Sequence, residues 1–145
     1  MAKWADMTQR EKNETIFTVV FGGKLKTQDE MRAIAEKAWL TQPRVTIFGL
    51  DGFAQVSETA PMFRQFIHNF TFDPAALELA KREVERRGWR WSIHNYRPGK
   101  YGAFIREGDG RDSWGSLLAV TDGPTEADAF GHAAVRACGW KEDAE

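Results

Sequence analysis

Apolar and polar positions in the first thirty residues follow the 3.6-residue period of a helix. Thr8-Gln9-Arg10-Glu11 has the residue types of a capping box, in which a hydroxyl and a carboxylate satisfy two backbone amides reciprocally. The pattern predicts a helix from about Gln9 to Phe21 that ends at Gly22-Gly23. A second box, Thr27-Gln28-Asp29-Glu30, predicts another helix. Its apolar face would comprise Met31, Ile34, Ala35, Ala38 and Trp39.

The middle of the chain changes to a strand pattern and then to an aromatic stretch. Arg44 to Ser57 alternates apolar with polar residues around Asp51-Gly52, which suits a tight turn, so a hairpin is expected. Residues 61–72 are rich in phenylalanine at helical spacing and favour a short helix followed by extended chain.

The second half has the clearest pattern. Asp73-Pro74 opens a helix that Gly88 closes, because the carboxylate caps the first turn and proline lacks only an amide that is unpaired there anyway. Three strands are then predicted over Trp89–Tyr96, Tyr101–Ile105 and Trp114–Val120. Gly123-Pro124-Thr125 opens a last helix. Its shared apolar face comprises Ala127, Phe130, Ala134 and Ala137.

These elements predict an α+β fold, with an antiparallel sheet that includes a three-stranded meander flanked by helices. The length of 145 residues is that of a single domain, residues 1–145, with residues 24–70 as a candidate elaboration. Of the six tryptophans, Trp4 and Trp140 lie near the two ends of the sequence. They are expected either to be exposed anchors or to hold the ends of the chain against the domain.

Composition indicates the expected cellular compartment, and the distribution of charge along the chain bears on function. The net charge is −1 and no apolar run reaches the roughly 20 residues of a membrane span, so a cytoplasmic protein is expected. Cys138 is the only cysteine, which excludes an internal disulfide. Charge is nevertheless uneven: residues 81–111 carry +5 and residues 112–145 carry −5. Such asymmetry orients a charged partner, or else the two regions neutralise each other in the fold.

No pattern of catalytic or metal-binding residues stands out. His68, His94 and His132 lack the spacing of metal ligands, so neither a metal nor another cofactor is expected. Gly22-Gly23-Lys24 lacks the rest of a phosphate-binding loop. Cys138 is expected to be a small buried apolar residue rather than a nucleophile.

The candidate binding residues form a basic and aromatic strip between the last two predicted helices. In the first strand, Arg90, His94 and Tyr96 alternate with Trp89, Trp91 and Ile93, so the two groups are expected on opposite faces. Arginine beside aromatic side chains suits protein interfaces and nucleic-acid stacking alike. The alternative is a sheet whose second face is also covered. The full strip is Arg90, His94, Tyr96, Arg97, Lys100, Arg106 and Arg111.

The second half also resembles the phage ABA sandwich domain, a family of small bacteriophage proteins. The likeness covers about half of the chain and is carried by Phe72-Asp73-Pro74-Ala75-Ala76, Gly88-Trp89, Pro124-Thr125-Glu126-Ala127 and Ala133-Ala134-Val135-Arg136-Ala137. Members often carry a Cys-Arg pair in the closing helix, whereas here Arg136 precedes Ala137-Cys138. The resemblance implies a phage protein acting in a bacterial host and brings no catalytic residues.

Three functions remain open from the sequence. The first is a non-catalytic protein that inhibits a host defence system by stoichiometric binding to a host or defence-system protein, as anti-CRISPR proteins do. The second is a nucleic acid or nucleotide binder that uses the strip. The third is a small enzyme with its site around His94 or His132. A homodimer is compatible with any of them.

Overall fold

The computed structural model describes residues 3–27, 29–30, 33, 67–108 and 116–142. The hairpin predicted over 44–57 lies outside these residues, as do Trp114, Arg111 and most of the aromatic stretch. The capping hydrogen bonds of the second predicted helix are present. The Glu30 amide donates to Thr27 Oγ1, and the Thr27 amide donates to Glu30 Oε1.

The N-terminal segment forms one continuous helical unit, as predicted. A short 3-10 turn, η1 (Trp4–Asp6), precedes α1 (Gln9–Thr15), which continues into a π-helical segment, η2 (Ile16–Val20). The capping box is made in full, with 3.2 Å from the Glu11 amide to Thr8 Oγ1 and 3.1 Å in return. Gly22, at a φ of 68°, follows the helical segment in the left-handed conformation that glycine adopts without strain.

The helix predicted after Asp73 is α3 (Pro74–Arg86). Asp73 Oδ1 accepts a hydrogen bond from the Ala75 amide at 3.0 Å, and Gly88 follows the helix at a φ of 82°. The buried side of α3 consists of Ala76, Leu77, Ala80 and Val84.

The sheet is the predicted antiparallel meander, in the order β1-β2-β3. Its strands are β1 (Trp89–Arg97), β2 (Lys100–Glu107) and β3 (Leu117–Gly123). The third strand differs from the prediction, because it begins at Leu117 and extends to Gly123, beyond the expected end at Val120. A register shift between Ile105 and Arg106 accompanies the β2–β3 pairing, and sequence alternation does not reveal such a shift.

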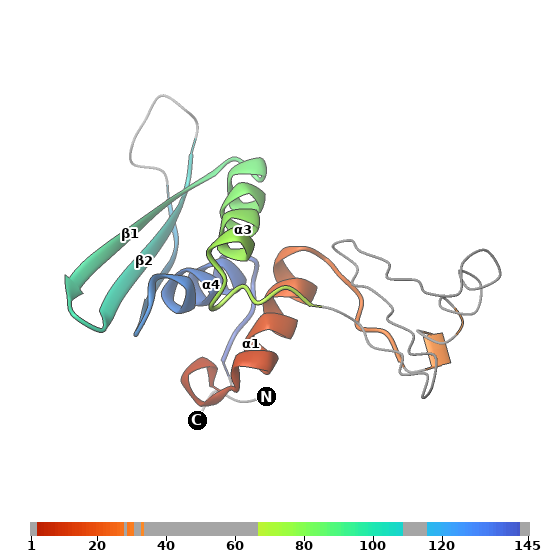
Figure 1. Cartoon of the computed structure of the whole chain (residues 1–145). Coiled ribbons are helices and arrows are strands. Elements are labelled where there is room, and N and C mark those ends of the chain that lie inside the picture. Colours follow the sequence, from red (N-terminus) through yellow and green to blue (C-terminus); the bar gives the residue numbers. More distant parts are fainter. Residues whose placement is uncertain (1–2, 28, 31–32, 34–66, 109–115, 143–145) are drawn as a thin grey trace.

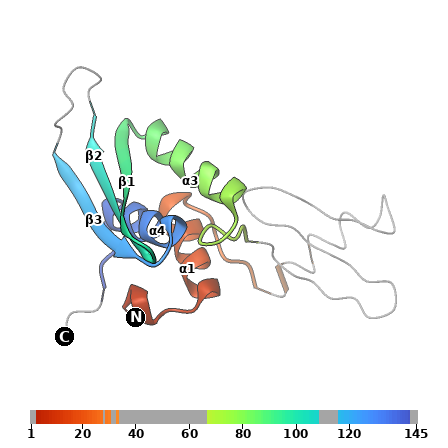
Figure 2. The same ribbon diagram turned by 60° about the vertical axis from the view of Figure 1, so that its left-hand side comes forward.

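Both helices next to the sheet pack on the same face, here called the inner face (Figures 1 and 2). The last helix, α4 (Glu126–Ala137), is buried from Ala127 to Val135 on all sides, not along the single predicted face. The sheet covers one side of α4, and η2 and α3 pack on it as well. Thr121 in β3 donates a 2.6 Å hydrogen bond to the Ala129 carbonyl and fixes α4 against the sheet.

The two terminal tryptophans hold the ends of the described chain together. Trp4 is 1% exposed and stacks on His132 in α4, with ring centroids 5.1 Å apart. Trp140 meets both rings edge-on, at 6.0 Å from Trp4 and 6.1 Å from His132. Of the two roles considered for these tryptophans, the structure thus selects packing against the domain. None of the helices in the described ranges has the length and apolar character that crossing a bilayer requires.

Candidate functional site

The face of the sheet opposite α3 and α4, here called the outer face, carries much of the predicted strip. No described helix lies over it (Figure 2). The register pairs Arg90 with Arg106 and His94 with Gly102. The predicted alternation in β1 is confirmed, since Trp89, Trp91 and Ile93 pack against the core. Within β1 and β2 the outer face consists of Arg90, Ser92, His94, Tyr96, Gly102, Phe104 and Arg106.

Two arginines face each other at one end of the outer face. Arg90 and Arg106 are direct cross-strand partners. The stem of Arg90 lies over Gly108, where an added Cβ would come within 2.7 Å of Arg90 Cγ. The absence of a side chain at this glycine lets the arginine stem lie close to the backbone.

The aromatic members lie across the middle of the outer face. Tyr96 is 54% exposed and lies over Gly102, where an added Cβ would approach its ring to 2.6 Å. His94 meets the Phe104 ring edge-on at 5.3 Å between centroids.

Apolar side chains of β3 extend this surface. Val120 pairs with Phe104 and is 45% exposed, and Leu117 pairs with Arg106 and is 48% exposed. Asp122, opposite Gly102, is an acidic residue at the turn end. Sequence alternation missed Val120 and Phe104 because the register was needed to show which side of each strand faces solvent.

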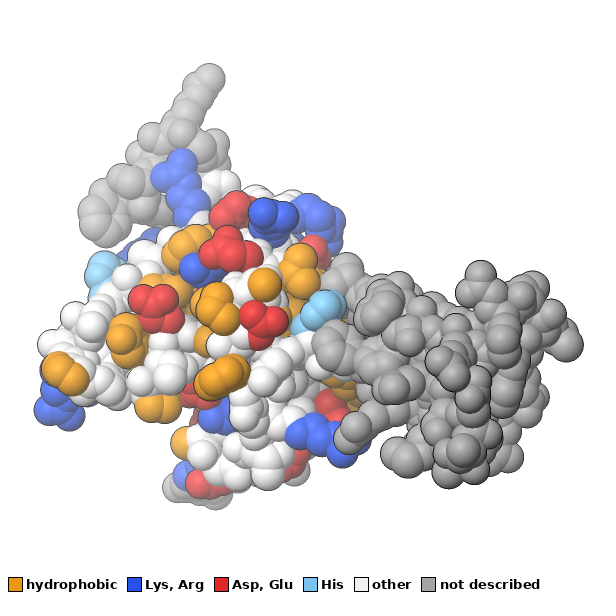
Figure 3. Space-filling view, viewed as in Figure 1, with side chains coloured by type: hydrophobic (Ala, Val, Ile, Leu, Met, Phe, Trp, Pro, Cys, Tyr) orange, Lys and Arg blue, Asp and Glu red, His pale blue; other side chains and the backbone are white. Residues whose placement is uncertain are grey.

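The cations of α3 do not contribute to this surface. Glu83 binds Arg86 at 2.6 Å and lies 3.7 Å from Arg87, and these arginines lower the pKa of the Glu83 carboxyl. Lys81 likewise pairs with Glu78 at 3.2 Å. Over α3, acidic and basic side chains lie side by side (Figure 3). The cations of residues 81–108 that lie outside these pairs are Arg82 in α3 and four in the sheet, Arg90, Arg97, Lys100 and Arg106.

The predicted strip divides into two groups. Arg97 and Lys100 are a cross-strand pair at the turn between β1 and β2, beyond a register shift after Asn95. They line a pocket of about 480 Å³ at the turn end of the sheet, here called the end pocket. Arg90, His94, Tyr96 and Arg106 stay on the outer face, and Arg111 lies outside the described residues.

The end pocket also contains His132, one of the two histidines considered for catalysis. Lys12 donates a 2.6 Å hydrogen bond to Asp128 Oδ1 in its wall. His132 Nε2 lies 2.9 Å from Glu142 Oε1, but without hydrogen-bond alignment. Burial lowers the pKa of His132, and the nearby Glu142 carboxylate opposes this shift only in part. The end pocket thus brings Lys12 of α1 together with a neutral imidazole, His132, and three acids from the C-terminal part of the sequence, Asp122, Asp128 and Glu142.

Acidification is expected to destabilise the protein through His132. Its folded pKa lies below the ordinary 6.5, so the unfolded chain takes up a proton first as pH falls. The stability contributed by the neutral ring is full above pH 6.5 and is lost below it. Urea unfolding between about pH 8 and about pH 5 should show a smaller acid-side loss in His132→Gln than in wild type. His94→Gln, at an exposed position, is the control, and equal losses in all three proteins would contradict the assignment.

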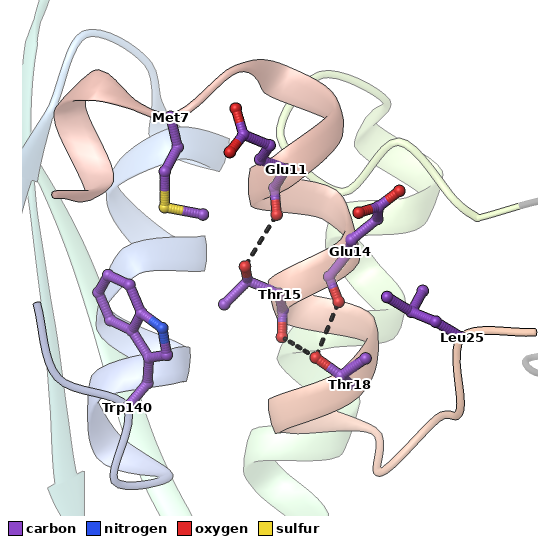
Figure 4. Close-up of a pocket in the computed structure, with 7 residues that line it drawn as sticks. All are labelled: Met7, Glu11, Glu14, Thr15, Thr18, Leu25 and Trp140. Carbon is purple, nitrogen blue, oxygen red and sulfur yellow. Dashed lines mark hydrogen bonds between the residues drawn. The ribbon is translucent and has the colours of Figure 1, made fainter. Parts of the chain in front are cut away.

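A second, smaller hollow lies between α1 and the C-terminal segment (Figure 4). It measures about 240 Å³, and its walls include Met7, Trp140 and Leu25. Its threonine hydroxyls are occupied within the helix, because Thr15 donates to the Glu11 carbonyl and Thr18 to the Glu14 carbonyl. We assign this hollow no chemistry.

The remaining candidates for chemistry are a metal site and the Cys138 thiol. Within the described ranges, no group of three or more metal-ligating side chains is close enough to hold an ion. Cys138 is half-buried, and burial raises the pKa of its thiol, which disfavours the reactive thiolate.

Searches of protein-family models, of curated proteins and of solved structures find no match to this chain. Its function must therefore be inferred from its own residues.

Proposed function

We propose that this protein is a non-catalytic binding protein that recognises an acidic protein surface through the outer face of its sheet. The observation that carries the proposal is the pairing of Arg90 with Arg106 beside the exposed side chains of Tyr96, Val120 and Leu117. Exposed apolar groups flanked by arginine are typical of interface centres, where aromatic and arginine side chains supply most of the binding energy.

The paired arginines favour an acidic partner. Two guanidinium groups on opposing strands place two positive charges at one end of the outer face, where a carboxylate of the partner can accept charge-assisted hydrogen bonds. The partner gains bidentate hydrogen bonds at the same time, because the planar guanidinium matches the geometry of a carboxylate.

The aliphatic members of the outer face favour a protein over a nucleic acid. Leu117 and Val120 offer no flat ring on which a base could stack, and the total charge of −1 gives no general attraction to a polyanion. Tyr96 and His94 are compatible with either partner, so nucleic-acid binding is kept as an outcome of the test.

Binding is also favoured over catalysis by the position of His132. A general base has to reach its substrate proton within hydrogen-bonding distance. His132 Nε2 is buried, and its ring is stacked against Trp4. His94 is the other candidate for catalysis. Within the described part of the chain, the contact found for its imidazole is with the Phe104 ring, which cannot assist proton transfer.

The resemblance to phage proteins supplies the class of partner. We propose a host or defence-system protein that is inhibited by occlusion, in the manner of an anti-CRISPR protein inside a bacterial cell. Small size and the exposed outer face suit stoichiometric binding, in which no turnover is needed.

Charge reversal on the outer face tests the proposal. The partner is first captured from bacterial lysate on the wild-type protein and identified. Arg90→Glu/Arg106→Glu is expected to weaken its binding by at least about 30-fold, because truncating one side of a desolvated charge pair costs about 2–5 kcal/mol. The thermal midpoint should stay nearly unchanged, since surface substitutions usually shift stability by about 0.5 kcal/mol or less.

Arg82→Glu/Lys141→Glu is the matched control, because it makes the same change in net charge at two exposed positions of α3 and the C-terminal segment. Equal binding by the two double variants would contradict the proposal. Retention of DNA or RNA, with an affinity that falls steeply as salt is added, would instead support the nucleic-acid alternative.

A further inference from the structure

The edge of β1 that faces away from β2 is open in the described part of the chain and is here called the open edge. The sheet has the order β1-β2-β3, so β1 is an edge strand (Figure 2), and no described segment pairs with its other side. At nine residues, Trp89–Arg97, it is the longest of the three strands. A long edge strand presents a row of backbone amides and carbonyls with which another strand can pair.

The register shows which backbone groups point to the open edge. The Gly108 amide donates to the Gly88 carbonyl at 3.1 Å, so these two residues form a hydrogen-bonded pair where the β1–β2 ladder starts. Hydrogen-bonded and non-hydrogen-bonded pairs alternate along an antiparallel ladder. The backbone groups of the outer-face residues of β1 before the register shift therefore point to β2. Those of Trp91, Ile93 and Asn95 point to the open edge.

The two edge strands differ in how well their inner-face side chains are covered. In β3, Ala119 and Thr121 are buried, at 7% and 5% exposed. In β1, Trp91 and Ile93 pack against the core but are only half-buried. The β1 side of the sheet thus retains apolar surface that a further strand and its side chains would cover, whereas the β3 side retains little.

A second copy of β1 is complementary to the open edge. In an antiparallel pairing about a two-fold axis at Ile93, Trp91 of each copy lies opposite Asn95 of the other. The amides and carbonyls of these three residues then all have partners. No two like charges are directly opposed, and Arg90 lies opposite Tyr96. The net charge of −1 also gives little repulsion between two copies.

We propose that this protein forms a homodimer in which the β1 strands of two copies pair antiparallel along their open edges. The pairing joins two three-stranded sheets into one continuous sheet. Because the two-fold axis is perpendicular to that sheet, both outer faces lie on the same side of the dimer. The dimer goes beyond the proposed recognition of an acidic protein and does not depend on it.

Light scattering of the free protein tests the assembly. The mass is expected to rise towards that of two chains as concentration increases, and the mass of a single chain at every concentration up to about 1 mM would overturn the proposal. Asn95→Pro removes an amide that points to the open edge and leaves the β1–β2 hydrogen bonds in place. It is expected to raise the dissociation constant about tenfold or more, since symmetry removes two donors at once.

Val120→Pro is the matched control. Val120 lies opposite Phe104, whose backbone groups point to β1, so the Val120 amide points away from β2 at the other edge of the sheet. This variant should dimerise as the wild type does, and circular dichroism checks that both proline variants are folded. Equal dissociation constants for the two folded variants would contradict pairing through β1.

A cysteine at the two-fold axis tests the register without relying on proline. Residues directly opposite in a hydrogen-bonded pair have Cα atoms about 5.5 Å apart, within the range of roughly 4.4–6.8 Å that a disulfide spans. Ile93→Cys/Cys138→Ser is expected to form a disulfide-linked dimer on mild oxidation, and Val120→Cys/Cys138→Ser is not. Crosslinking of the second variant alone, or of neither, would overturn the proposal. These measurements use the free protein, so their failure does not bear on partner binding at the outer face.

Discussion

Replacing Phe130 by alanine is expected to lower the free energy of unfolding by about 3–5 kcal/mol. Phe130 is 0% exposed at the centre of α4 and meets the Trp91 ring edge-on, with centroids 5.6 Å apart. The loss combines the transfer free energy of the ring with the cavity left between α4 and the sheet. Urea unfolding should show a lower midpoint, and an unchanged slope would indicate that the transition remains two-state.

Phe72→Ala is the matched control, because Phe72 is the same residue type but 76% exposed. Its expected effect is about 0.5 kcal/mol or less. Phe130→Leu keeps most of the apolar volume and should fall between the two, which preserves the test if the alanine variant does not fold. A loss below about 1 kcal/mol in Phe130→Ala would contradict the central position of α4.

Replacing Lys12 by methionine is expected to cost about 2–4 kcal/mol at neutral pH. Breaking a buried ion pair from one side leaves an uncompensated charge and costs about 3–5 kcal/mol. The expected loss is somewhat smaller here, because the side chains of Lys12 and Asp128 are still 14% and 11% exposed. The loss arises because Asp128 is left charged and poorly hydrated between α1 and α4.

A double variant separates the charge effect from lost packing. Lys12→Met/Asp128→Asn removes both charges and should recover most of the stability lost in Lys12→Met, as measured by urea unfolding in a double-mutant cycle. If the double variant is as unstable as the sum of the two single variants, the pair contributes no coupling, contrary to the short distance between Lys12 Nζ and Asp128 Oδ1.

The sequence was most informative where local chemistry decides structure. Capping by Thr8 and Asp73 and chain reversal at Gly88 depend on neighbouring residues alone, and the helices predicted to begin at these two caps and the meander after Gly88 are confirmed. The face that α4 buries was predicted too narrowly, since His132 and Asp128 are buried as well as Phe130. Helical periodicity identifies a single apolar face. It does not show that the other faces of the helix are also buried by tertiary packing.

The candidate site shows the same limit. Alternation in β1 placed Arg90 and Tyr96 on a common face, because side chains in a strand alternate with a period of two. The register shift after Asn95 separated Arg97 from them, and no residue in the sequence marks that shift. The end pocket could not be predicted from the sequence for a different reason, because its Lys12–Asp128 pair joins residues that are 116 positions apart.

Site-specific photo-crosslinking tests the outer face most directly. A photoreactive phenylalanine analogue is placed at Tyr96, and separately at Phe72, which is also exposed but precedes α3. After irradiation in a bacterial lysate, the outer-face position is expected to yield one crosslinked protein species whose labelled peptide is rich in Asp and Glu, while position 72 yields none. Crosslinks from position 72 but not from position 96, or crosslinks from position 96 only to nucleic acid, would contradict recognition of an acidic protein by the outer face.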